Sequence, residues 1–213
     1  MIVWPMFVKG ISELLTHLAQ LLDGSFGLSV IALAVFVRLM LLPMTLQVAE
    51  QGWHRQRRLA ALKPKLENLR ERHAGDPAAY ASATQALYRE HGVTAGLGSS
   101  LRVAAIQAPI GAGIYAAIKQ GVAGAGAFLW IPKLARPDLW LALIVAVLSF
   151  AAVVLNPAMP EQAKMMLQLL PVLISFFLVW HLAAGLGLYW AGSTSVNLVQ
   201  TLLLRRRIRR MPS

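Results

Sequence analysis

The sequence predicts an all-α integral membrane protein with five transmembrane helices around a hydrophilic groove, and three observations lead to this prediction. Of the 213 residues, 57% are hydrophobic and 14% are charged, whereas a soluble domain is roughly 45–50% apolar and about 25% charged. The apolar residues gather in blocks of about twenty, which is the length needed to cross a bilayer core. Uncharged polar side chains and one arginine recur inside these blocks, so the helices should enclose something other than lipid.

Residues 1–24 form the first predicted element, an N-terminal amphipathic helix. Its apolar residues follow helical spacing, whereas Lys9, Glu13, His17 and Gln20 supply a polar side. We predict that this helix lies on the bilayer surface. Packing against other helices is the alternative, and the pattern alone does not separate the two. The segment lacks the basic start and small-residue cleavage site of a signal peptide.

Five segments have the composition of spanning helices; the first occupies the region 25–48 and the other four the region 97–204. Their approximate limits are 28–48, 101–118, 139–155, 165–183 and 188–204. The second segment is the least apolar, because it contains Arg102 and Gln107. Four tryptophans fall near the outer ends of spans, where aromatic side chains favour the interface: Trp130, Trp140, Trp180 and Trp190.

The polar region 49–96 predicts a helical hairpin outside the membrane. Leucines recur at spacings of three and four before the sequence AGDP, in which Gly75 ends one helix, Asp76 caps the next and Pro77 takes its first position. Pro64 should bend the first arm. The arms carry a set of basic residues: Arg57, Arg58, Lys63, Lys65, Arg70 and Arg72.

The distribution of positive charge predicts the orientation in the membrane. Fourteen of the 20 Lys and Arg residues lie in the hairpin, the loop 156–164 and the tail 205–213, whereas three lie in the segments on the other side. By the positive-inside rule the hairpin and the C-terminus face the cytoplasm and the N-terminus faces outward. The basic cytoplasmic surface should attract anionic lipids.

Arg38 lies in the middle of the first span, where a charge costs about 2.5–3.5 kcal/mol. None of the nine acidic residues falls inside a predicted span, so no carboxylate offsets this cost within the membrane. The polar residues of the spans therefore either line a hydrated groove or only join neighbouring helices, and the unpaired charge favours the groove. The predicted groove residues are Arg38, Thr45, Gln107, Trp190, Ser193 and Asn197, of which the last three share one stripe of the fifth span.

The residue inventory also limits the chemistry. The chain has no cysteine, which excludes thiolate metal sites and cysteine nucleophiles, and we predict no catalytic site, cofactor or metal. A small-solute transporter or channel is one alternative, which the missing intramembrane carboxylates disfavour. An intramembrane serine protease using Ser193 or Ser195 with His181 is another, although no acid or oxyanion donor accompanies them.

Six stretches in order resemble the YidC family of membrane protein insertases. They are VRLMLLPMTLQ, LKPKLENLRERHAGDPAAYASATQALYREHGV, IQAPIGAGIY, FLWIPKLARPD, QAKMMLQLLPVLISFF and GLGLYWAGSTSVNLVQ, and the resemblance covers nearly all of residues 25–204. It implies a bacterial inner-membrane protein that transfers hydrophobic segments of nascent membrane proteins into the bilayer, and it implies no enzyme activity. The groove would be open to the cytoplasm and the lipid and closed outside, with Arg38 as its positive centre.

The resemblance further implies that the basic hairpin receives substrates or targeting machinery, and that the protein works alone or beside the Sec translocon. It also implies contact with the ribosome and no DNA partner. Two positions depart from the family pattern. Ser149 is the only interior polar group of the third span, where the family pattern leads us to expect a glutamine. Arg102 is unusual, and it either adds charge to the groove mouth or extends to the interface.

Overall fold

The computed structural model describes residues 3–93, 97–157 and 164–209, and these residues confirm the all-α fold class. They contain no strand apart from an isolated bridge between Phe128 and Ile131. By length and composition, one described helix qualifies to cross a membrane, and two shorter apolar helices cover 139–154 and 169–181. The helices are α1 (Val3–Leu21), α2 (Phe26–Arg72), α3 (Pro77–Glu90), α4 (Leu97–Gly121), the short 3-10 turn η1 (Val122–Gly124), α5 (Leu139–Val154), α6 (Lys164–His181) and α7 (Ala184–Arg209).

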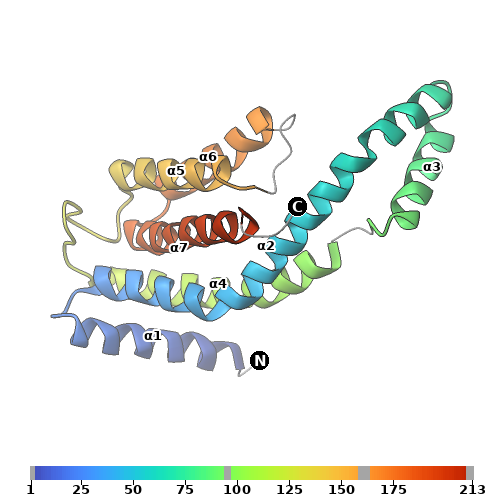
Figure 1. Ribbon diagram of the computed structural model, residues 1–213. Helices are drawn as coiled ribbons and strands as arrows, with labels where there is room; N and C mark the ends of the chain where they lie inside the picture. The colour runs from blue at the N-terminus through green and yellow to red at the C-terminus, as the bar shows by residue number, and fades with distance from the viewer. Residues whose placement is uncertain (1–2, 94–96, 158–163, 210–213) are drawn as a thin grey trace.

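Helix α2 joins the first apolar segment and the first hairpin arm without interruption. It begins at Ser25, whose side chain accepts a hydrogen bond from the Leu28 N–H, and it continues through Pro43 and Pro64. Its 47 residues span about 70 Å at 1.5 Å per residue. The predicted boundary at residue 48 is therefore a change of composition within one helix, and the outer half of α2 projects away from the bundle (Figure 1).

Helix α3 folds back against the far end of α2. Asp76 caps it by accepting hydrogen bonds from Ala78 N and Ala79 N, with Pro77 in the first turn, as predicted. Helix α2 ends at Arg72 with His73 as its C-cap, three residues before Gly75. Between the arms, Lys65 Nζ lies 2.8 Å from His91 Nε2.

The remaining helices form a bundle in which α7 lies between α2 and α5, and α6 packs on α5 (Figure 1). Its core combines buried residues of α1, α2, α4, α7 and the loop before α5. The helices approach closely where a glycine lacks a side chain. A Cβ atom on Gly185 would lie 2.4 Å from Val122, so α7 contacts η1 directly.

One end of the bundle is closed by the connecting segment 125–138. Phe128, Ile131 and Leu134 are buried there. The first turn of α7 is hydrogen-bonded to this segment, since Ala184 N donates to Arg136 O at 2.9 Å and Gly185 N donates to Leu134 O at 3.0 Å. Because main-chain and apolar contacts both join the segment to the helices, this end of the bundle has a firm apolar cover.

Helix α1 packs along α2 and α4 (Figure 1). Packing against other helices was one of the two arrangements considered for the amphipathic helix. Val8 and Leu15 are buried, and the Phe7 ring fills the space above Gly113. The start of α1 lies toward the same end of the bundle as the end of α7 (Figure 1). The sides of the membrane on which the two termini lie stay a prediction.

Candidate functional site

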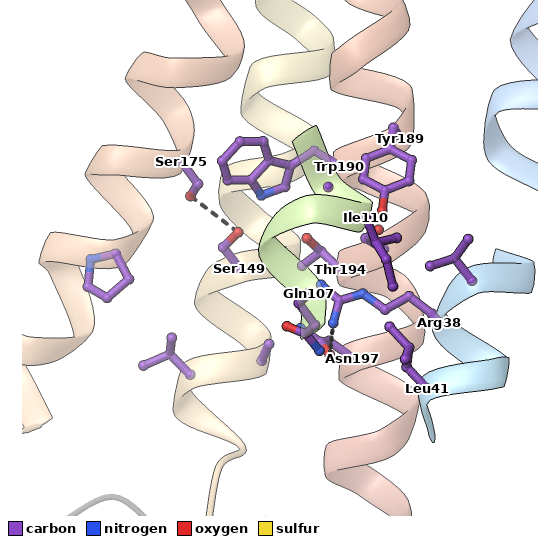
Figure 2. A pocket seen from close by; sticks show the side chains of 16 residues that line it. Arg38, Leu41, Gln107, Ile110, Ser149, Ser175, Tyr189, Trp190, Thr194 and Asn197 are labelled. Carbon is purple, nitrogen blue, oxygen red and sulfur yellow. Dashed lines mark hydrogen bonds between the residues drawn. The ribbon is translucent and has the colours of Figure 1, made fainter. Parts of the chain in front are cut away.

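A cavity of about 480 Å³ lies between α2, α4, α5, α6 and α7 (Figure 2). We call it the Arg38 pocket. Five of the six predicted groove residues line it, namely Arg38, Gln107, Trp190, Ser193 and Asn197. It is further lined by Val37, Leu41, Ile110, Gly111, Ser149, Ala152, Val153, Pro171, Ser175, Tyr189 and Thr194.

Arg38 supplies the charge of the pocket. Its side chain is half-buried and points from α2 toward α7, where Nη1 donates to Asn197 Oδ1 at 3.4 Å (Figure 2). This long hydrogen bond to a neutral amide does not neutralise the guanidinium. No carboxylate is among the described lining residues, so the pocket presents a positive charge whose N–H groups can donate to an anionic or carbonyl group.

Helices α4 and α7 place the neutral polar groups around this charge. Gln107 projects from α4 toward the Arg38–Asn197 contact (Figure 2). On α7, Trp190, Ser193 and Asn197 are spaced by three and four residues, so they face the pocket together. The stripe predicted from the sequence is therefore one wall of the pocket.

Thr45 does not line the pocket. Its hydroxyl lies 3.0 Å from Gln200 Oε1 and 3.1 and 3.2 Å from the carbonyls of Leu41 and Leu42. The contact with Gln200 joins α2 to α7. Thr45 therefore connects neighbouring helices, which was the alternative to lining the groove. Its hydroxyl is occupied within the protein rather than in the cavity.

Sequence reasoning missed part of the opposite wall. Ser149 on α5 and Ser175 on α6 line the pocket, and their hydroxyls are hydrogen-bonded at 3.2 Å (Figure 2). Ser175 is 4% exposed. The available signal was a single serine within each of two largely apolar segments. This wall is polar even though the expected glutamine is missing.

The predicted hairpin residues lie apart from the pocket, on the exposed outer half of α2. The Arg57 guanidinium lies 5.1 Å from the centre of the Trp53 ring, and Lys65 contacts His91. Arg58, Lys63, Arg70 and Arg72 are exposed on the same arm. The side chain of Arg102 lies outside the described residues, so its two interpretations stay predictions.

The predicted interfacial tryptophans divide into two groups. Trp130, Trp140 and Trp180 are exposed, and the Trp130 indole donates to Asp138 Oδ1 at 3.1 Å. Trp190 instead turns its ring into the pocket, toward Ser149 and Ser175 (Figure 2).

The residues of the alternative serine protease are not arranged for catalysis. The Ser195 hydroxyl donates to Ala191 O at 2.9 Å, and His181 Nδ1 donates to Phe177 O at 2.7 Å. Ser193 has no hydrogen-bond partner among the described residues. A serine nucleophile needs a base within hydrogen-bond reach, and neither serine has His181 as a partner in the described part of the chain.

The sequence of the chain matches a known protein family. The family model described as 60Kd inner membrane protein matches residues 17–211. A membrane protein insertase YidC from Ralstonia nicotianae is 32% identical over 94% of this chain and 36% of its own length. The insertase YidC of Fusobacterium nucleatum is 28% identical over 86% of this chain and 88% of its own. YidC 1 of Lactiplantibacillus plantarum is 31% identical over 98% of this chain and 72% of its own.

A solved structure is similar as well. The crystal structure of an active YidC insertase with its first transmembrane domain resolved superposes with a TM-score of 0.64 at 25% identity, over 90% of this chain and 44% of that chain. The chain thus spans less than half of the crystallised protein and about a third of the Ralstonia relative. These relatives are named for insertion, not for a catalysed reaction. The resemblance seen in the sequence is confirmed, and the chain belongs to the YidC family of membrane protein insertases.

Proposed function

We infer that this chain inserts hydrophobic segments of nascent membrane proteins into the bilayer, using the Arg38 pocket to hold the polar residues that must cross. The observation that carries the proposal is a half-buried arginine facing a cavity of about 480 Å³ that has neutral polar walls and no carboxylate among its described lining residues. A positive charge in such a cavity lowers the cost of moving a short, acidic or polar segment out of water.

The arrangement in the membrane follows from composition and packing. Helices α2, α4, α5, α6 and α7 would be the five spans, with the hairpin and the arginine-rich tail in the cytoplasm because most of the positive charge lies there. The closed end at 125–138 would then face outward, so that the pocket opens toward the cytoplasm and the lipid.

The partners of this activity are proposed on chemical grounds. The substrates are nascent membrane proteins, which the hairpin would receive with targeting machinery, beside the Sec translocon or alone. The exposed basic residues of the hairpin, such as Arg58 and Arg70, suit anionic lipid headgroups and ribosomal RNA phosphates.

Crosslinking from the pocket tests the proposal. A photoreactive residue at Gln107 or at Asn197 should crosslink to a stalled nascent membrane protein, because both side chains line the Arg38 pocket. Val147 is the matched control, since it is 66% exposed on the outer face of α5. Crosslinks from Val147 equal to those from the pocket, or none from the pocket, would contradict the proposal.

Arg38→Ala should slow insertion of a segment that carries acidic residues. A charged hydrogen bond contributes about 1.5–3 kcal/mol, so the expected loss is about 10- to 160-fold. Arg136→Ala is the control, because Arg136 is exposed in the loop that covers the closed end. Wild-type rates for Arg38→Ala would remove the assigned role.

A further inference from the structure

A second cavity, of about 230 Å³, lies between α1, α2 and α4. We call it the apolar pocket. The described residues that line it are all hydrophobic, namely Phe7, Ile11, Leu14, Leu33, Phe36, Val37, Met40, Leu41, Ile110 and Ile114. A water molecule inside a protein needs about two to four polar partners, and none of these side chains offers one. An apolar occupant therefore suits this cavity better than water does.

The exposure of the lining residues shows that the apolar pocket has a floor and an open rim. Leu33 and Ile114 are buried and form the floor, whereas Phe36 and Met40 are exposed and form part of the rim. Phe36 and Met40 flank Arg38 in the part of α2 that is proposed to span the bilayer. With α2 in that position, the rim opens toward the acyl chains of the surrounding lipid.

The apolar pocket adjoins the Arg38 pocket. Val37, Leu41 and Ile110 line both cavities, so these three side chains form a wall that the cavities share. Side chains that border a void lose dispersion contacts on that side, and an occupant of the void restores them. An occupant of the apolar pocket therefore supports the shared wall from the side opposite Arg38.

We propose that the apolar pocket binds one acyl chain of a bilayer phospholipid, and that the bound chain supports the wall shared with the Arg38 pocket. An apolar cavity of about 150 Å³ holds a benzene molecule, so the volume of about 230 Å³ accepts a stretch of several methylene groups. The described lining residues carry no charge, so the site recognises the chain and not the headgroup. The proposal uses the inferred position of α2 and α4 in the bilayer and assigns a lipid site that the insertase function does not require.

Photolabelling of the purified full chain in liposomes tests this assignment. The probe is a phosphatidylcholine with a diazirine in the middle of one acyl chain, and mass spectrometry locates the labelled residues. Labels are expected on Ile11 and Leu33, which line the apolar pocket and not the Arg38 pocket. Leu14→Trp places a larger side chain at the rim and should reduce these labels several-fold. Leu143→Trp on α5 is the matched control, because both leucines are 41% exposed and Leu143 is not among the described lining residues.

The labelling also identifies the occupant. Phosphatidylglycerol with the same modified chain should label Ile11 and Leu33 as strongly as phosphatidylcholine does, and a clear preference for either headgroup would overturn recognition by the chain. Equal labels in wild type and Leu14→Trp, or no labels on Ile11 and Leu33, would overturn the site. Loss of the labels when a single-span substrate is added would identify a polypeptide as the occupant and overturn the proposal as well.

Thermal stability tests the supporting role of the bound chain. Addition of phosphatidylcholine to the chain in detergent micelles should raise the Tm, because a ligand that binds only the folded state stabilises it. Leu14→Trp should show a smaller rise than Leu143→Trp, since its indole hinders entry of the acyl chain. Equal rises for the two variants would contradict this role. Neither measurement depends on insertion, so a failure of the lipid site is distinguishable from a failure of the insertase function.

Discussion

Glu50 and Arg207 form an ion pair between α2 and α7, and the structure predicts that its two members contribute unequally to stability. Arg207 Nη1 lies 2.8 Å from Glu50 Oε1, with 59% of the arginine side chain exposed and 19% of the glutamate. Oε1 itself is buried and lacks an aligned hydrogen bond, so the contact is mainly one of charge.

The magnitude follows from distance and exposure. At 2.8 Å, two unit charges attract by about 6 kcal/mol at an effective dielectric constant of about 20 and by about 1.5 kcal/mol in water. The exposed arginine places the pair nearer the lower limit, so we expect a coupling of about 1–2 kcal/mol. Arg207→Gln leaves a partly buried carboxylate without its counter-charge and should cost about 2–3 kcal/mol, whereas Glu50→Gln leaves a hydrated guanidinium and should cost about 1 kcal/mol.

A double-mutant cycle in detergent micelles measures both quantities. Arg207→Gln should lower the Tm by about 4–12 °C for a chain of this size, and the double variant should recover part of that loss. Arg206→Gln, an exposed neighbour on the same turn, should change little. Equal costs for the two single variants, or a coupling below about 0.3 kcal/mol, would refute the reasoning from burial.

Three further substitutions test other parts of the fold. Gly27→Ala places a Cβ 2.4 Å from the Phe128 ring and should destabilise the closed end by about 1–3 kcal/mol, read as a lower Tm; an unchanged Tm would show that the ring moves aside. Asp138→Ala removes the acceptor of the Leu141 N–H and should cost about 1 kcal/mol, which Asp138→Asn should largely restore. Asn197→Asp sets a carboxylate against Arg38 and should slow insertion of acidic segments without lowering the Tm, a result that unaltered insertion would contradict.

The sequence was sufficient to predict the charged part of the pocket. No acidic residue falls inside a predicted span, so the sequence showed that Arg38 has no carboxylate partner there. Helical spacing placed Trp190, Ser193 and Asn197 on one face of α7. The face on which a helical residue lies is a local property that no tertiary contact alters. Each of these residues lines the pocket. Residue spacing and charge therefore predict which residues of a single helix face the pocket.

The rest depended on how helices meet. Thr45 shares a face with Arg38, but seven residues separate them by about 10 Å along α2, which places its hydroxyl beyond the pocket and beside Gln200. Ser149 and Ser175 meet only because α5 and α6 rotate their serines toward each other. The residue pattern within one segment does not specify that rotation, so the Ser149–Ser175 part of the wall could not be predicted from it.

Some polar residues of the apolar helices line the groove, and others form contacts between helices, which we call joints. Both interpretations of these residues therefore apply, but to different residues. Thr45–Gln200 and Glu50–Arg207 join α2 to α7 on one side of Arg38, whereas Asn197 belongs to the pocket through its contact with that arginine. Because these contacts join the same two helices, the joints fix the position from which Arg38 reaches into the cavity. Weakening a joint should therefore alter insertion through the placement of the charge, even where the pocket residues themselves are intact.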